Sequence, residues 1–465
     1  FFVHRFAVDL ERFILFQKNG HMSHQFDKEG QILRFGVERL LPYDRILAAA
    51  RTTGFCHRIR KIHPVLFLQV VLFAPCLHSH ATVAEIWRTY RSLTESDIAY
   101  SSFVDRLDDS ASRFFKVVLD ECIQSSIGNM ALELQERYAR FVTVFIQDST
   151  IIRVSKKLAD KFPAARTRRV AAGLKIPYVL NVLTNGPHTI SIVPERTAEA
   201  KTLRLGPWIA GSLLLLDLGF YGYNHFARIH ENRGFFVSRV KEGSKLTIKE
   251  IHSKMAKEQR DALVEQDLPS VIAGLPIKSI DATITVQLKR RRYKGKQRQE
   301  AYSFRCVGRV NPKTEKWHLY LTNLKGDDFT VDEIAELYRF RWEIESLFDE
   351  AKNECTLGDV GVKREGATKA LLLAMLIRQV VLRRVYLVLR TLVNETIRQR
   401  FSRKLYGRVF IEQIDLLLEI VIDEWRPPGE QMRGRDGWSL WFDNLSRNSL
   451  QYHPKKLVRD TILKR

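Results

Sequence analysis

The chain has 465 residues, of which 45% are hydrophobic and 28% are charged, an ordinary composition for a globular protein with room for several domains. Its charge is unusual, because 75 Lys and Arg against 53 Asp and Glu give a formal net charge of +22. This excess predicts a polyanionic partner, since Lys and Arg displace counterions from phosphates. The alternative, an anionic membrane surface, would favour one concentrated basic helix, whereas here the basic residues are spread along the chain.

The five cysteines are odd in number and widely spaced, and none has a partner at zinc-site spacing. This pattern favours free thiols in a reducing compartment. Residues 64–77 are too few to span a bilayer, and residues 370–393 are interrupted by four arginines, so we expect no membrane segment and a cytoplasmic location. Residues 1–29 form a leader to which we assign no function, because Met22 opens a more ordinary start than Phe1.

Residues 30–135 are predicted to be helical, with helices over 48–60, 64–77, 81–93 and 97–107. The last two are short and joined by a polar turn, a pattern that resembles a helix-turn-helix with the second helix as the recognition helix. Two ordinary packed helices give the same pattern. Recognition of DNA by this region and simple helix packing therefore both stay open.

From about residue 140 the pattern changes to short apolar runs. We predict strands over 141–147, 177–184, 188–195, 213–216 and 235–240, and helices near 198–205 and over 223–234. The first strand is expected to end at Asp148 and the fourth at Asp217. The predicted order is three strands, then a fourth strand, a helix and a fifth strand. This order predicts a mixed α/β sheet with helices packed on it.

Residues 243–325 interrupt this order with predicted antiparallel strands over 282–310 and 316–324, a β-rich insertion. The range 282–310 contains two strands joined by a tip at residues 289–298, and this tip is very basic. It is either a solvated hairpin or a surface that contacts phosphates, and we favour the second because seven Lys and Arg exceed what solubility needs. The predicted DNA contacts are Arg290, Arg291, Arg292, Lys294 and Lys296.

A helix is predicted to follow Thr330, a good N-cap with Glu333 at the capping-box position. Tyr338, Arg341, Glu345 and Lys352 lie at offsets of 0, 3, 7 and 14 along it. At about 100° per residue these offsets fall within an arc of about 60°. A solvated helix face gives a similar pattern, but an adjoining apolar stripe predicts that the helix docks on a core.

Asp148, Asp217 and Glu345 are candidate ligands of two divalent cations, and oxygen-only ligands imply Mg²⁺ or Mn²⁺. Aspartates after strands are also common turn residues, and Asp349 competes with Glu345 as the third ligand. Arg341 and Lys352 are expected to bind phosphate oxygens, and Tyr338 to donate a hydrogen bond or stack on a base. Trp342 belongs either to the core or to a base-stacking surface.

The spacing Y-x2-R-x3-E-x6-K resembles the YREK signature of insertion-sequence-4 type transposases of the DDE class. The contexts of Asp148 (DST) and Asp217 (DLGFY) are similar to those of that family. The resemblance implies a ribonuclease-H-like core in 138–242 and 326–360, a β insertion in 243–325, a helical DNA-binding region in 30–135 and a helical basic region in 361–465.

The resemblance also implies the reaction. Asp148, Asp217 and Glu345 would be the metal ligands, and Tyr338, Arg341 and Lys352 would contact DNA. A prokaryotic, nucleoid-associated homodimer would bind terminal inverted repeats in double-stranded DNA, nick the element ends and join the 3′-hydroxyls to target DNA. The alternatives are a related nuclease that cuts without joining and a transposase-derived DNA-binding protein.

Overall fold

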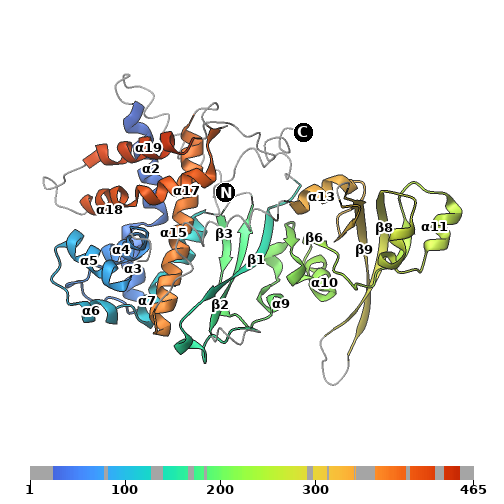
Figure 1. Cartoon of the computed structure of the whole chain (residues 1–465), viewed down its shortest axis with the longest axis horizontal. Coiled ribbons are helices and arrows are strands. Elements are labelled where there is room, and N and C mark those ends of the chain that lie inside the picture. The colour runs from blue at the N-terminus through green and yellow to red at the C-terminus, as the bar shows by residue number, and fades with distance from the viewer. Residues whose placement is uncertain are drawn as a thin grey trace. The chain divides into compact units, whose positions relative to one another are not determined.

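The computed structural model describes residues 25–77, 82–126, 140–165, 172–182, 186–290, 297–311, 314–339, 341, 362–393, 398, 400–424 and 434–450. The chain divides into two compact units (Figure 1). The helical unit comprises residues 1–129, 151–174 and 347–465. The sheet unit comprises residues 130–150 and 175–346.

One mixed sheet is built from strands between residues 144 and 322, with strand order β3-β2-β1-β5-β6-β10-β9-β8-β7 and β4 paired to β2. Its strands are β1 (Val144–Arg153), β2 (Gly173–Asn181), β3 (Gly186–Ile190), β4 (Val193–Pro194), β5 (Leu213–Leu216), β6 (Phe235–Arg239), β7 (Thr247–Ile251), β8 (Ser279–Lys289), β9 (Gln299–Val310) and β10 (Trp317–Thr322). β1, β5 and β6 run parallel, whereas β2 and β3 are antiparallel to each other, as are β6 and β10.

The residues explain this order. β5 consists of four leucines that are all buried, as expected for a parallel strand covered on both faces. β8 alternates between buried and accessible positions, the pattern of a strand with one covered face. The helix α10 (Tyr223–Glu231) connects β5 to β6 and buries Phe226 and Ile229, so these two parallel strands are joined by a crossover.

The predicted fold class, a ribonuclease-H-like mixed sheet with a β-rich insertion and helical flanking regions, is confirmed. The insertion strands β8, β9 and β10 are antiparallel as expected. They also continue the same sheet, because β10 pairs with β6. The sequence did not predict the insertion's short helices α11 (Lys257–Leu263) and α12 (Leu268–Val271).

Several predicted bounds were wrong. β1 does not end at Asp148 but runs on to Arg153, because the β-branched residues after the polar Asp-Ser-Thr triplet keep an extended, alternately buried pattern. The strand expected over 188–195 is split between β3 and β4. The helix expected near 198–205 is the single turn α9 (Glu199–Thr202), followed by the 3-10 turn η3 (Pro207–Ile209).

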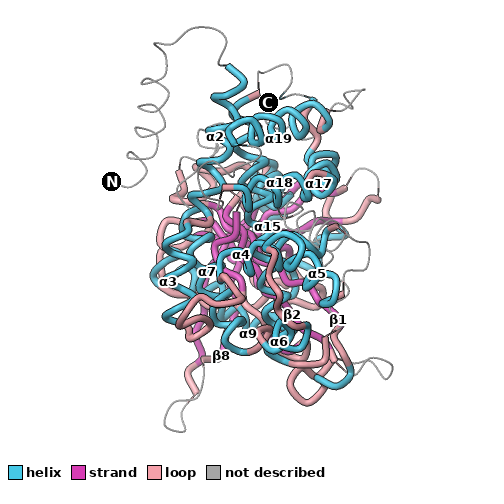
Figure 2. Tube along the Cα trace, turned by 90° about the vertical axis from the view of Figure 1, so that its left-hand side faces the viewer, coloured by secondary structure: helices cyan, strands magenta, loops and turns pink. Residues whose placement is uncertain are grey.

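The helical unit is built from α2 (Gln25–Leu40), α3 (Tyr43–Thr52), α4 (Pro64–Phe73), α5 (Val83–Thr94), α6 (Tyr100–Asp105), α7 (Asp109–Ser126), α15 (Glu365–Leu392), α17 (Arg403–Glu412), α18 (Ile414–Asp423) and α19 (Gly434–Asn448). α15 packs against α7, α2 and α4, and α19 lies beside α2 (Figure 2). The predicted helix 48–60 instead ends at Thr52, shortly before Gly54 takes a φ of +76°.

The helical flanks are confirmed within the described residues. None of the described helices is long and apolar enough to cross a bilayer. Arg378 explains how α15 remains a core helix despite its arginines, because its buried Nη1 donates a hydrogen bond to the carbonyl oxygen of Leu72 at 2.8 Å. Cys56, Cys122 and Cys306 are buried and form no disulfide, in line with the prediction of reduced thiols.

Candidate active site

Two aspartates meet at the end of the parallel strand pair in the sheet unit. The β1–β5 register ends at Gln147 opposite Leu216, so Asp148 and Asp217 are the next residues on adjacent parallel strands. Asp217 follows β5 directly and precedes the 3-10 turn η4 (Leu218–Phe220). The structure therefore brings these two predicted site residues together, although β1 itself continues.

The surroundings of Asp148 disfavour its negative charge. Burial is the main cause that raises its pKa to about 6, and the carboxylates of Asp217 and Glu199 raise it further. The Ser149 backbone N–H, which donates to Asp148 Oδ1 at 2.7 Å, and the charge of Arg341 act in the opposite direction. Asp148 thus sits where a positive charge would stabilise the ionised carboxyl.

The helix α13 (Val331–Arg339) carries Tyr338, and Arg341 follows two residues after the helix ends. Its start is fixed as predicted, because Thr330 and Glu333 form the reciprocal hydrogen bonds of a capping box. Arg341 lies in a turn beyond the helix, where its backbone N–H donates to the carbonyl oxygen of Tyr338 at 3.1 Å. Glu345 and Lys352 lie outside the described residues.

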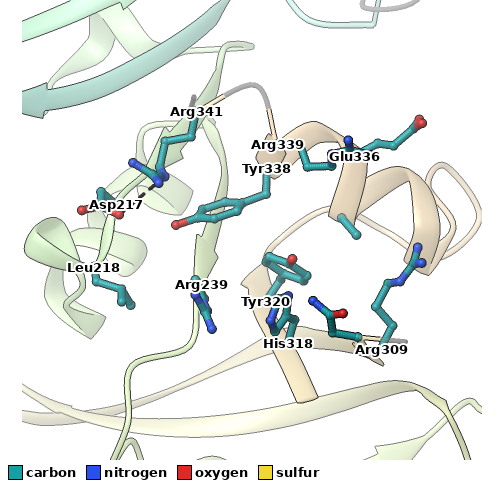
Figure 3. Close-up of a pocket in the computed structure, with 12 residues that line it drawn as sticks. Asp217, Leu218, Arg239, Arg309, His318, Tyr320, Glu336, Tyr338, Arg339 and Arg341 are labelled. Atoms are coloured by element: carbon teal, nitrogen blue, oxygen red, sulfur yellow. Dashed lines mark ion pairs between the residues drawn. The ribbon is translucent and has the colours of Figure 1, made fainter. Parts of the chain in front are cut away.

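Tyr338 of α13 and Arg341, from the turn beyond that helix, approach Asp217 (Figure 3). Arg341 Nε lies 3.5 Å from Asp217 Oδ1, and only 12% of the arginine side chain is exposed. The guanidinium carbon lies 5.8 Å from the centroid of the Tyr338 ring. Burial raises the pKa of Tyr338 to about 12, so its hydroxyl remains a hydrogen-bond donor at neutral pH.

A further acidic side chain, Glu199 of α9, lies near Asp148 and was missed by sequence reasoning. Its Oε1 accepts a hydrogen bond from Ser149 Oγ at 2.8 Å. Its other oxygen lies against Gly219, where an added Cβ would stand 1.7 Å from Glu199 Oε2. Glu199 therefore contacts Ser149, the neighbour of Asp148, and packs against Gly219, two residues after Asp217. Nothing in the local sequence signals this, because the contact depends on how the strands are ordered.

The donor set at this site consists of carboxylate oxygens, which suit a hard divalent cation. The described residues contain no group of three or more His, Cys, Asp or Glu side chains close enough to hold a metal ion. The described residues thus contribute two carboxylates to a metal site, those of Asp148 and Asp217. Burial, together with the charge of Asp217, raises the pKa of Asp148. Both predicted candidates for the third ligand, Glu345 and Asp349, lie outside the described residues, as does Trp342.

The cationic hairpin between β8 and β9 is described only at its base. Arg290 Nε donates to Glu300 Oε2 at 2.7 Å, and its Nη2 contacts both Glu231 and the Tyr302 hydroxyl. This guanidinium is therefore engaged by its own chain. The other predicted contacts of the tip lie outside the described residues: Arg291, Arg292, Lys294 and Lys296.

The sequence matches the family model described as "Transposase DDE domain" over residues 140–379. It is 21% identical over 286 residues to the transposase for insertion sequence element IS231E of Bacillus thuringiensis subsp. finitimus, covering 56% of this chain and 60% of that protein. It is 22% identical over 349 residues to the transposase for insertion sequence element IS1151 of Clostridium perfringens, covering 69% of this chain and 73% of that protein. The chain thus spans less than two thirds of the first relative and more of the second.

Proposed function

This chain belongs to the DDE transposase family, whose members are metal-dependent enzymes that cut and join DNA, and from that membership we propose that it is an active transposase of an insertion sequence. It would bind the terminal inverted repeats of its element, nick the ends and join the freed 3′-hydroxyls to target DNA. The observation that carries the proposal is the meeting of Asp148 and Asp217 at adjacent strands, with Arg341 held against Asp217.

We assign Asp148, Asp217 and Glu345 as the catalytic carboxylates that hold Mg²⁺ or Mn²⁺, with two ions in the site. When bound, the cations would lower the pKa of the attacking hydroxyl and neutralise charge on the leaving oxygen. Burial, and to a smaller extent the charge of Asp217, raises the pKa of Asp148, which supports this assignment, because a bound cation would offset both effects.

Tyr338, Arg341 and Lys352 are the proposed contacts to DNA near the scissile phosphate. The protonated hydroxyl of Tyr338 can donate to a phosphate oxygen, and the planar guanidinium of Arg341 can donate to two. These residues, with Glu345, would place the chain in the insertion-sequence-4 type subgroup with the YREK signature. Arg341 has a second role in this proposal, which is to hold Asp217 in position before DNA arrives.

Glu199 is a positioning residue in this scheme. It receives the Ser149 hydroxyl on one side and fills the space beside Gly219 on the other. These contacts tie the backbone after Asp148 to the turn after Asp217. The separation of the two catalytic carboxylates would therefore depend on a side chain that touches neither metal nor DNA.

The remaining DNA contacts are assigned by region. We propose that the helical region 30–135, with α5 and α6 as its helix-turn-helix, and the tip of the insertion 243–325 bind duplex DNA. The core would be 138–242 and 326–360, followed by the basic helical region 361–465. Arg290 would support the tip from its base, because two carboxylates hold it there. A homodimer associated with the nucleoid in a prokaryotic cytoplasm would assemble the two element ends.

A strand-transfer assay tests the proposal. The substrate is the DNA that flanks the reading frame, cut at its inverted repeats and incubated with Mg²⁺ and a plasmid target. We expect joined product from the wild type, and binding without joined product from Asp148→Ala, Asp217→Ala and Glu345→Ala. Cleavage without joining would identify a nuclease instead, and binding without either reaction would identify a DNA-binding protein.

A further inference from the structure

A pocket of about 400 Å³ opens beside Asp217 and extends away from it beneath α13. Asp217 and Arg341 lie at one end, and Arg309, His318 and Tyr320 lie towards the other (Figure 3). Tyr338 stands between the two ends, with Arg341 on one side and Arg239 on the other. The pocket is therefore continuous with the proposed site but reaches well past it.

Strand register explains why basic side chains gather there. Tyr320 of β10 lies opposite Arg239 of β6, and His318 lies opposite Arg309 of β9. Tyr320 and His318 are two residues apart on one strand, so all four side chains share one face of the sheet. Arg339 at the end of α13 adds a third arginine from above. We call Arg239, Arg309, Arg339, His318 and Tyr320 the arginine pocket.

Three arginines line the same pocket as the Tyr320 ring. Burial raises the pKa of the Tyr320 hydroxyl, and the charges of Arg239, Arg309 and Arg339 each oppose that rise. The rings of Tyr320 and Tyr338 lie 5.2 Å apart between centroids and form the floor of the space. Three like charges around one cavity repel one another unless an anion lies between them.

Among the described residues, a carboxylate pairs with only one of these three arginines. Within the part of the chain that the structure describes, the side chains of Arg239 and Arg339 form no ion pair or hydrogen bond. Arg309 pairs with Asp332 at 2.7 Å, but 80% of the aspartate side chain is exposed, so the pair is readily exchanged for another anion. Figure 3 shows the carboxylate of Glu336 pointing away from His318 and Tyr320.

We propose that the arginine pocket is a phosphate subsite, which binds an internal phosphodiester of the DNA strand whose scissile phosphate lies at Asp217. The inference rests on the proposed function for the identity of the strand. Arg239 of β6 and Arg309 of β9, on opposite sides of β10, would bind the phosphate from two sides, and Arg339 would contact it from α13. The subsite would fix the strand some distance from the scissile bond, so that its loss lowers DNA affinity before it affects the chemical step.

The test measures binding of a fluorescein-labelled DNA duplex with a 3′ overhang, by anisotropy, across a range of NaCl concentrations without divalent metal. The double variant Arg239→Ala/Arg309→Ala should bind about tenfold more weakly at low salt. Its plot of log affinity against log salt should be flatter by about 1 for the lost phosphate. Lys257→Ala is the matched control, because Lys257 is an exposed cation of α11 that does not line the pocket.

A position-specific test uses duplexes in which one phosphate at a time is a neutral methylphosphonate. For the wild type, a methylphosphonate at one internal position should weaken binding. The same methylphosphonate should not weaken binding further in the double variant. Arg239→Lys/Arg309→Lys should recover part of the salt dependence but less of the affinity, because lysine lacks the bidentate fork. Circular dichroism melting checks that each variant is folded.

Strictly additive effects at every position, or an unchanged salt slope, would overturn the proposal. Protection of the wild type by inorganic phosphate without any non-additive DNA position would show a small-anion site instead, which would also overturn it. These results leave the proposed function standing if the wild type still joins DNA. Failure of the wild type to cut or join any DNA would refute the proposed function, whereas the methylphosphonate cycle would still report on the pocket.

Discussion

The carboxyl of Asp148 should destabilise the metal-free protein at neutral pH, and Asp148→Asn should remove that cost. The asparagine keeps the shape of the side chain and an oxygen that can accept the Ser149 N–H. It cannot ionise. The substitution therefore isolates the penalty of a negative charge in a buried position beside Asp217 and Glu199.

The expected change in unfolding free energy follows from the pKa of Asp148. Because burial raises the pKa of Asp148 from 3.8 to about 6, the stability that this carboxyl contributes is complete below its unfolded pKa and is lost as the pH rises through about 6. The interval corresponds to about 3 kcal/mol of unfolding free energy. This is an upper limit, because Asp148 keeps partial contact with water. The advantage of Asp148→Asn over the wild type in unfolding free energy should reach about half of this value at pH 5 and nearly all of it at pH 7.

Urea denaturation in EDTA at pH 5, 6, 7 and 8 measures the difference. Asp148→Asn should be more stable than the wild type, with a gap that widens up to pH 7 and is constant above it. Asp327→Asn, an exposed carboxyl in the same unit, should change the unfolding free energy little at any pH. If Asp148→Asn is no more stable than the wild type at pH 7, the described electrostatics of this site are wrong.

Three further predictions concern the residues that place the site. Glu199→Ala should lower the rate of strand joining about tenfold or more while DNA affinity is retained, and Glu199→Gln should restore much of the rate because it keeps the Ser149 contact; joining rates and anisotropy check both. Gly219→Ala should cost about 1–3 kcal/mol in urea denaturation, and Glu199→Ala in the same chain should relieve most of it, because the added Cβ meets Glu199. Thr330→Ala should lower the unfolding free energy by about 1 kcal/mol through loss of the α13 cap, whereas Thr330→Ser should be close to neutral.

Local signals were enough to predict much of the fold. The four leucines of β5 and the capping box at Thr330 each act over a few neighbouring residues, and the structure has both where the sequence placed them. The end of β1 was misplaced because Asp148 and its polar neighbours look like a turn. Polar residues remain in a strand when its partner strands hold the backbone extended, and that depends on pairing, not on composition.

The candidate site was predicted in part, because two aspartates after apolar runs suggest neighbouring strand ends. Glu199 was missed, since it is 50 residues from Ser149 in sequence and belongs to one turn of helix with no pattern of its own. For Arg290, the sequence predicts contact with DNA, and this stays a prediction. The sequence did not indicate that Glu231, which lies 59 residues away, contacts the Arg290 guanidinium in the folded chain. Side-chain partners at such separations are decided by topology.

Binding of Mn²⁺ to the DNA-free protein tests the central assignment most directly. Electron paramagnetic resonance measures the free Mn²⁺ that remains as protein is added, so the result does not depend on activity. The account predicts that the wild type removes the free signal and that Asp148→Ala, Asp217→Ala and Glu345→Ala each bind clearly less, with Asp327→Ala as the unaffected control. Wild-type Mn²⁺ binding by Asp217→Ala would contradict the assignment of these carboxylates as the metal site.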